Sequence, residues 1–177
     1  MGILVCGLNG AGKSTIGKML AARLGYRFLD IETLYFPQSD AEYPYDSPRS
    51  KAEVSRLLEA EIGDDRRFVL AAVNGNYGTP LASMLDCAVV LDVPKPIRMA
   101  RIRSRSFERF GAQMQEGGNL YEKELAFFAF AERRTDADFE DWLQTAGIPV
   151  FRMDGTLPPE KLVEMISLRI ATIVRLL

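Results

Sequence analysis

The 177-residue sequence predicts an α/β fold, a three-layer αβα sandwich with a five-stranded parallel sheet. Short, almost wholly apolar runs at residues 3–6, 68–73 and 87–93 are typical of strands covered on both faces. Segments with helical spacing of apolar residues lie between these runs, and strands that alternate with helices form parallel sheets with right-handed crossovers. The length suits a single domain, residues 1–177, with one hydrophobic core.

The first strand, residues 3–6, leads into a glycine-rich loop with the spacing G-x-x-x-x-G-K-[ST]. A helix follows at residues 16–24, and Gly25 is its stop signal. In this setting backbone N–H groups point at phosphate oxygens, Lys13 reaches the terminal phosphates, and the Ser14 hydroxyl holds Mg²⁺. The expected nucleotide-binding residues of the loop are Gly7, Asn9, Gly10, Ala11, Gly12, Lys13, Ser14 and Thr15.

The second strand, residues 26–29, ends at Asp30. Asp30 and Glu32 are one residue apart at the carboxyl end of this strand, where a parallel sheet binds its ligands. We expect both carboxylates to face the ligand, although loop carboxylates are often only solvated or capping groups.

Residues 35–49 show no helical or alternating period and are predicted to form a loop. Arg49, just before the next helix, is a candidate clamp for an anionic substrate, or a plain exposed arginine. Ser50 and Glu53 form a capping-box pattern that starts a helix ending near residue 62. Segment 33–62 is therefore expected to bind substrate. Four aromatic residues of the loop are expected either to form a wall of the substrate site or to pack beneath the loop: Tyr35, Phe36, Tyr43 and Tyr45.

The third strand, residues 67–73, ends in Asn74 and Gly75. The glycine permits close approach of a ligand, and Asn74 stands where a side chain can order metal-bound water. Both are expected to contact substrate. A short helix then starts at Thr79, and Asp92 ends the fourth strand as a solvated group or a metal helper.

Four arginines follow the fourth strand at intervals of three, four and four residues: Arg98, Arg101, Arg105 and Arg109. This spacing places them on one face of a helix. Four guanidinium groups repel one another, so an anion that bridges them relieves the repulsion. The alternative is a solvated basic face, but the phosphate-binding loop elsewhere in the chain favours a site.

The last third of the chain contains a glycine-bearing segment, a helix, a strand and a final helix. Segment 106–120 is expected to act as a small lid. We expect one long helix over residues 121–146, a fifth strand at 150–153, and a final helix announced by Pro158 and Pro159.

Composition restricts the chemistry. The sequence has no histidine, which excludes histidine bases and Ser-His-Asp catalysis and leaves carboxylates, Lys, Arg and bound metal. The net charge of −2 gives no general attraction to nucleic acid or to an anionic membrane. Without a membrane span or a secretory signal, a cytoplasmic monomer or homodimer is expected. Cys6 and Cys87 fall in strands and are expected to be buried and reduced.

With the loop, Asp30-x-Glu32 and the arginine helix, the chain resembles P-loop small-molecule kinases of the adenylate kinase and shikimate kinase type. The resemblance implies the P-loop NTPase fold. It also implies that Asp30 serves Mg²⁺ or the acceptor hydroxyl and that Glu32 contacts substrate. Arg101 and Arg105 would meet the nucleotide and its phosphates, and Arg133 or Arg134 would match a later lid arginine. A backbone loop beside adenine is implied at Asp154, Gly155 and Thr156.

The sequence therefore predicts transfer of the γ-phosphoryl group from ATP, with Mg²⁺, to a small-molecule acceptor. Lys13, Asp30, Arg101 and Arg105 are the expected catalytic residues, and Ser14 and Asp30 the expected metal ligands. A nucleoside or nucleotide kinase is an alternative. A nucleotide-binding regulatory ATPase or switch is an alternative of another class. Kinase action on a nucleic-acid end is disfavoured because no extended basic tract is present.

Overall fold

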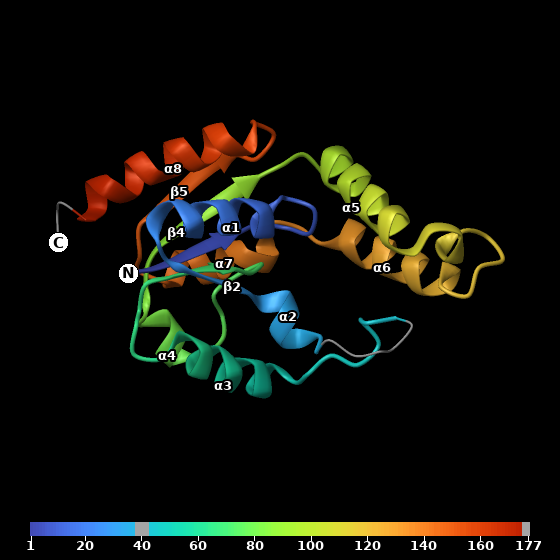
Figure 1. The fold of residues 1–177 in the computed structure, drawn as a ribbon, viewed down its shortest axis with the longest axis horizontal. Coiled ribbons are helices and arrows are strands. Elements are labelled where there is room, and N and C mark those ends of the chain that lie inside the picture. Colours follow the sequence, from blue (N-terminus) through green and yellow to red (C-terminus); the bar gives the residue numbers. More distant parts are fainter. Residues whose placement is uncertain (38–42, 175–177) are drawn as a thin grey trace.

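A computed structural model describes residues 1–37 and 43–174 (Figure 1). Its five strands form one parallel sheet in the order β2-β3-β1-β4-β5. This confirms the predicted α/β fold with helices on both faces of a five-stranded parallel sheet. The strands are β1 (Gly2–Cys6), β2 (Arg27–Asp30), β3 (Phe68–Ala71), β4 (Leu85–Asp92) and β5 (Val150–Asp154).

The central strand β1 is completely buried because strands pair with it on both edges and helices cover both faces. On one face, α1 (Lys13–Leu24) and α8 (Pro159–Val174) contribute to one apolar cluster. On the other face, α3 (Lys51–Ile62), α4 (Thr79–Ala82) and α7 (Ala137–Thr145) contribute to a second cluster. The rigid centre fixes the loop that follows β1.

A pair of helices extends beyond the sheet and is called here the helical hairpin, residues 95–133 (Figure 1). It consists of α5 (Lys95–Phe110), the 3₁₀ turn η1 (Gly111–Met114) and α6 (Tyr121–Arg133). Its own small apolar cluster contains Met99, Ile102, Phe128 and Ala131. Segment 106–120, expected to be a lid, is the tip of this hairpin.

The local start and stop signals behave as the sequence indicates. Ser50 and Glu53 form the reciprocal capping box of α3, and Gly25 ends α1 in the left-handed conformation. Cys6 and Cys87 are buried free thiols. None of the helices in the described part of the chain combines the length and the apolar character that a bilayer span requires.

Two local predictions are wrong. The expected helix over 121–146 is broken, because Arg134 has an extended backbone and the Asp138 carboxylate accepts a hydrogen bond from Thr135 N at 2.9 Å. This side-chain bond offers the backbone an alternative to helix. A short helix that was not predicted, α2 (Ile31–Tyr35), lies between β2 and the expected loop, with Asp30 as its N-cap. The strand expected at 67–73 is shorter at both ends.

Candidate active site

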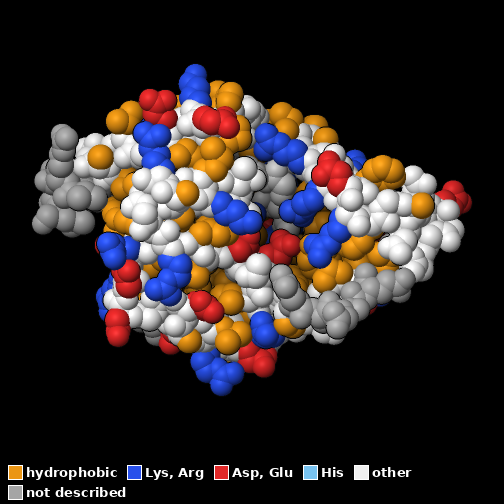
Figure 2. Space-filling model, in the orientation of Figure 1, with side chains coloured by type: hydrophobic (Ala, Val, Ile, Leu, Met, Phe, Trp, Pro, Cys, Tyr) orange, Lys and Arg blue, Asp and Glu red, His pale blue; other side chains and the backbone are white. Residues whose placement is uncertain are grey.

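A cavity of about 750 Å³ opens at the carboxyl ends of the strands. It lies between the glycine-rich loop, α2, the end of β3 and the helical hairpin. Figure 2 shows the hollow near the centre of this face, with acidic side chains inside and basic side chains around it. A cavity of this size is within the range of small-molecule sites.

The glycine-rich loop has the conformation that its sequence requires. Gly10 and Gly12 have φ of 80° and 95°, which a side chain disfavours, and a Cβ at Gly10 would lie 2.5 Å from the carbonyl oxygen of Arg98. Asn9, Gly10, Gly12, Lys13, Ser14 and Thr15 line the cavity, whereas Gly7 and Ala11 support the loop from beneath.

Lys13 is held at the base of the cavity, where Nζ donates a hydrogen bond to Leu8 O at 3.1 Å. Burial lowers the pKa of Lys13 from 10.5 to about 8, and the nearby Glu32 carboxylate partly offsets this. Because a buried ammonium is short of counter-charge, an anion beside it is favourable.

Asp30 and Glu32 both line the cavity, as expected. Asp30 Oδ1 accepts a hydrogen bond from Glu32 N at 3.1 Å, so the N-cap fixes the carboxylate at the end of β2. Its Oδ2 makes no hydrogen bond to another described residue. Glu32 Oε1 accepts a hydrogen bond from the Tyr45 hydroxyl at 3.1 Å. These two cavity carboxylates are thus held by α2 and by Tyr45, 13 residues beyond Glu32 in the sequence.

The four arginines of α5 do not share one anion site, which corrects the expectation from their spacing. Arg98 is only 4% exposed, and it donates hydrogen bonds to Val93 O and to Asn9 O. Arg109 donates to the Tyr45 hydroxyl at 2.6 Å. Arg105 is exposed and lines the cavity. Helical spacing alone does not reveal that loop carbonyls accept hydrogen bonds from Arg98 and Arg101 and that a tyrosine hydroxyl accepts one from Arg109.

Arg101 lies beside the glycine-rich loop and beside the loop after β5. Its guanidinium donates to Gly155 O at 3.2 and 3.3 Å and to Gly10 O at 3.5 Å. Asp154 Oδ1 accepts hydrogen bonds from Thr156 N and Thr156 Oγ1. Arg101, Asp154, Gly155 and Thr156 thus lie together, next to the loop and outside the lining of the large cavity.

Arg134 lines the cavity, whereas its neighbour Arg133 is exposed and does not. Arg134 Nη1 donates to Asn9 Oδ1 at 3.0 Å, and its Nε lies 3.3 Å from Asp138 Oδ1. Asn74 Nδ2 donates in turn to Asp138 O at 2.7 Å. Asp138 was not expected from the sequence. The signal that locates it is the helix break, which appears only in the structure.

Two expected substrate contacts serve other roles. Gly75 does not reach the cavity, because it packs against Trp142, and a Cβ there would lie 2.4 Å from the indole ring. Arg49 Nη1 donates to Leu34 O at 2.8 Å and ties the chain after α2 to that helix. Asn74 does line the cavity, where its Oδ1 accepts a hydrogen bond from Asn76 N.

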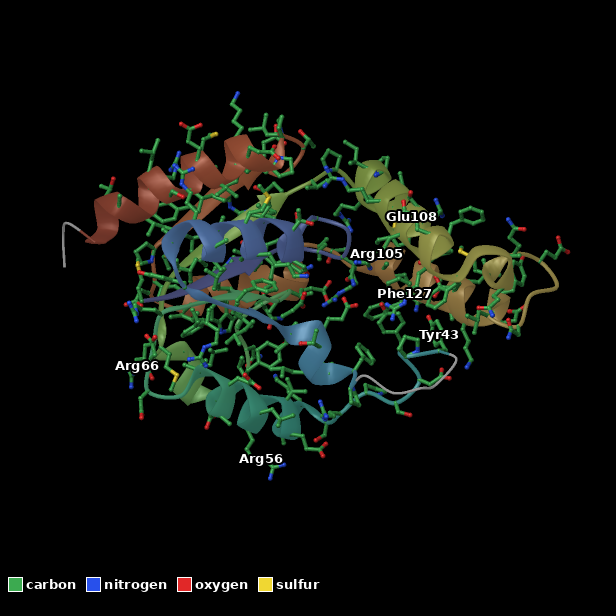
Figure 3. All side chains as sticks on the ribbon, in the orientation of Figure 1. Tyr43, Arg56, Arg66, Arg105, Glu108 and Phe127 are labelled. Atoms are coloured by element: carbon green, nitrogen blue, oxygen red, sulfur yellow. The ribbon has the colours of Figure 1, made fainter. Side chains whose placement is uncertain are left out.

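Aromatic side chains cover much of the cavity, and we call this set the aromatic wall. Phe36 and Tyr45 meet edge to face at 5.1 Å, Tyr43 and Tyr45 at 5.4 Å, and the Tyr45 and Phe127 rings are nearly parallel at 6.4 Å. Figure 3 labels Tyr43 and Phe127, which lie close together below the hairpin. The wall consists of Tyr35, Phe36, Tyr43, Tyr45, Tyr77, Phe127 and Phe130.

Within the described residues, no group of three or more Cys, Asp and Glu side chains is arranged to hold a metal by itself. Mg²⁺ does not need such a cage, because it keeps several waters and takes one or two protein ligands together with substrate phosphates. Ser14 and Asp30 line the same cavity as Lys13, so the residues present fit this mode of binding.

A family model for the AAA domain matches residues 3–116, which is more than half of the chain. The chain belongs to the AAA domain family. The matched part contains the P-loop, both cavity carboxylates and Arg101 and Arg105.

Among relatives, this AAA domain chain is 29% identical to YqaC of Bacillus subtilis (strain 168), over 86% of this chain and 87% of the relative. It is 57% identical to a shikimate kinase of Persephonella marina, over 77% and 88% of the two chains. The match to a shikimate kinase of Microcystis aeruginosa, at 29% identity, spans just over half of that relative, 58% of its length.

Solved structures with the same fold include a deoxyadenosine kinase from M. mycoides, with a TM-score of 0.59 at 16% identity over 97% of this chain and all of the other. A gluconokinase from Sinorhizobium meliloti has a TM-score of 0.57 at 17% identity, over 92% and 87% of the two chains. The AAA domain chain is accordingly a P-loop kinase of the shikimate and adenylate kinase type, an ATP-dependent phosphotransferase for a small molecule.

Proposed function

We propose that the chain transfers the γ-phosphoryl group of MgATP to a hydroxyl group of a small acceptor held between Asp30 and the aromatic wall. One observation carries this proposal: Lys13, Ser14 and Asp30, from two different strand ends, line a single cavity. Phosphoryl transfer requires nucleotide phosphates, metal and acceptor to be positioned together. Lys13, Ser14 and Asp30 provide one protein group for each of them.

In the proposed reaction the acceptor oxygen attacks the γ-phosphorus. A new O–P bond forms while the bond from the γ-phosphorus to the bridging oxygen breaks, and its electron pair stays on ADP. The acceptor proton passes to Asp30, whose Oδ2 makes no hydrogen bond to another described residue. Alternatively, Asp30 and Ser14 would together hold Mg²⁺.

The basic groups are assigned by their positions. Lys13 and the loop amides hold the β- and γ-phosphates, and bound Mg²⁺ supplies charge neutralisation there. Arg101, next to Gly155, lies along the nucleotide, while Arg105 and Arg134 line the cavity and meet the transferred group. Glu32 and Asn74 contact the acceptor. Segment 106–120, the tip of the helical hairpin next to Arg105, closes as a lid.

The test is acceptor-dependent release of ADP. Purified protein with MgATP is screened against sugars and sugar acids such as gluconate, shikimate, nucleosides and nucleotides. We expect at least one class to raise ADP release well above the rate without acceptor, and phosphorylated acceptor to appear in equal amount. ADP release that no acceptor stimulates would instead support a nucleotide-dependent switch.

A nucleoside or nucleotide kinase is the second candidate, and the aromatic wall favours it. Aromatic rings stack on flat bases, whereas a polyol is recognised chiefly by hydrogen bonds. In the same screen, nucleosides and nucleotides form the arm that tests it.

A further inference from the structure

The Tyr45 hydroxyl lies between a carboxylate of the cavity and an arginine of the helical hairpin. It donates a hydrogen bond to Glu32 Oε1 at 3.1 Å and accepts one from Arg109 Nη1 at 2.6 Å. Because a guanidinium can only donate, the single proton of the hydroxyl is directed to the carboxylate. Burial and the Glu32 charge raise the pKa of Tyr45 to about 12, so the hydroxyl keeps this proton.

The ring of Tyr45 is packed on several sides, which fixes the position of its hydroxyl. The Arg109 guanidinium lies over the ring at 5.1 Å from its centroid, and the Phe127 ring is nearly parallel to it at 6.4 Å. Phe36 and Tyr43 meet the ring edge to face at 5.1 and 5.4 Å. A side chain packed in this way has little freedom to change its rotamer.

Glu32 and Lys13 carry opposite charges and line the same cavity, yet Lys13 forms no ion pair with any carboxylate of the described residues. Its Nζ donates instead to Leu8 O at 3.1 Å. Burial lowers the pKa of Lys13, and Glu32 is the charged neighbour that offsets this fall most. The two groups therefore attract each other across the cavity without meeting, while Tyr45 holds the carboxylate.

A direct pair between Glu32 and Lys13 would obstruct nucleotide binding. The ammonium would already have a counter-charge, so the phosphates would have to displace a carboxylate and approach its negative charge. Arg105 and Lys51 also line the cavity, but both side chains are exposed, and water and salt weaken their attraction for a carboxylate. Once released from Tyr45, Glu32 is therefore attracted most strongly to Lys13.

We infer that Tyr45, held by Arg109, is a positioning residue that keeps Glu32 from pairing with Lys13 and so leaves the P-loop free to bind nucleotide. Tyr45 acts through Glu32 and not on the phosphates directly. The helical hairpin takes part, because Arg109 belongs to α5. The inference rests on the phosphate-binding part of the proposed function and is independent of the acceptor.

The test is a double-mutant cycle on nucleotide affinity. The Mg²⁺ complex of a non-hydrolysable ATP analogue is titrated calorimetrically into the 177-residue chain, at one pH and without acceptor. Tyr45→Phe keeps the ring but removes the hydroxyl, and it should weaken binding about tenfold. In the Glu32→Gln background the same change should have no effect, because no carboxylate remains to pair with Lys13. This reversal also excludes a folding defect as the cause of the loss.

Two further variants test the hairpin and the specificity of the effect. Arg109→Met removes the guanidinium that holds the Tyr45 hydroxyl. It should weaken binding less than Tyr45→Phe does, and only while Glu32 is present. Tyr121→Phe removes a hydroxyl from α6 outside the cavity lining and should leave the affinity unchanged.

The inference is overturned if Tyr45→Phe binds the analogue as the parent does, because Glu32 then does not turn to Lys13. It is also overturned if Tyr45→Phe costs the same affinity with and without Glu32, because the hydroxyl then acts on the fold or on the nucleotide itself. If Arg109→Met binds as the parent does, the hairpin has no part in positioning Glu32. Failure of the proposed phosphoryl transfer is seen separately, as ADP release that no acceptor stimulates.

Discussion

Arg134 Nη1 donates a hydrogen bond to Asn9 Oδ1 at 3.0 Å, across 125 residues of sequence. This bond joins the break between α6 and α7 to the tip of the P-loop. The guanidinium therefore lies over the phosphate-binding loop, within the cavity.

The first prediction concerns this arginine. Arg134→Gln should lower the turnover number about 10² to 10³-fold, the loss typical when one preorganised donor to developing charge is removed. The neighbouring Arg133→Gln, on an exposed side chain, is the matched control. Steady-state ADP release with the best acceptor of the screen measures both, and equal turnover in the two variants would contradict the assignment.

The second prediction concerns Asp138, which pairs with Arg134 and keeps its backbone bond to Asn74 when its side chain changes. Asp138→Asn should reduce turnover less than Arg134→Gln does, because the guanidinium remains but is less well oriented. In the Arg134→Gln background the same change should have little further effect. Additive losses in this double-mutant cycle would show that the two residues act separately.

The third prediction is a pH dependence of nucleotide binding. Burial lowers the pKa of Lys13 to about 8, so the free protein loses this positive charge as the pH rises through 8. Phosphate binding needs the ammonium, and the dissociation constant for MgATP should therefore rise up to about tenfold per pH unit above 8. Calorimetry from pH 7 to 9.5 measures this rise. Lys13→Ala should bind more weakly and lose the pH dependence, and the same slope in this variant would exclude Lys13 as its source.

The fourth prediction concerns Asp30, the carboxylate proposed to face the acceptor. Asp30→Asn should lower transfer about 10² to 10⁴-fold if the carboxylate takes the proton. MgATP affinity should change little, unless Asp30 also belongs to the metal shell, in which case the Mg²⁺ requirement rises. Asp64→Asn, an exposed loop residue, is the control. Near-normal transfer at saturating Mg²⁺ and acceptor would exclude Asp30 and direct attention to Glu32.

The fifth prediction is one of stability. Gly75→Ala places a methyl group where the Trp142 ring lies, and overpacking of this kind costs about 1 to 3 kcal/mol of unfolding free energy. Urea denaturation measures the loss. Trp142→Leu in the same chain should relieve part of it, and an unchanged penalty in that background would mean that the ring is not the obstacle.

Much of the fold follows from local patterns in the sequence. The buried strands, the P-loop between β1 and α1 and the capping box of α3 depend on nearby residues, so the sequence alone predicts them. The break after Arg133 does not follow in this way. It depends on Asp138 and on Asn9, which accepts a hydrogen bond from Arg134. No glycine or proline in the sequence marks the break.

The same limit applies to the site. The loop spacing predicts Lys13 and Ser14 because one short segment contains the whole motif. Arg98 and Arg105 look alike in sequence, and only tertiary packing turns one towards a P-loop carbonyl and the other towards the cavity.

The stretch that carries Tyr43, Tyr45 and Asp46 is fastened to the helical hairpin at three points. The Tyr43 hydroxyl donates to buried Glu124, Arg109 donates to Tyr45, and Lys123 pairs with Asp46. Residues 43–46 and 95–133 therefore form one structural unit, and a substitution in one segment affects the position of the other. A chimaera whose hairpin lacks Arg109, Lys123 and Glu124 would lose all three contacts, unless residues 43–46 are exchanged together with the hairpin.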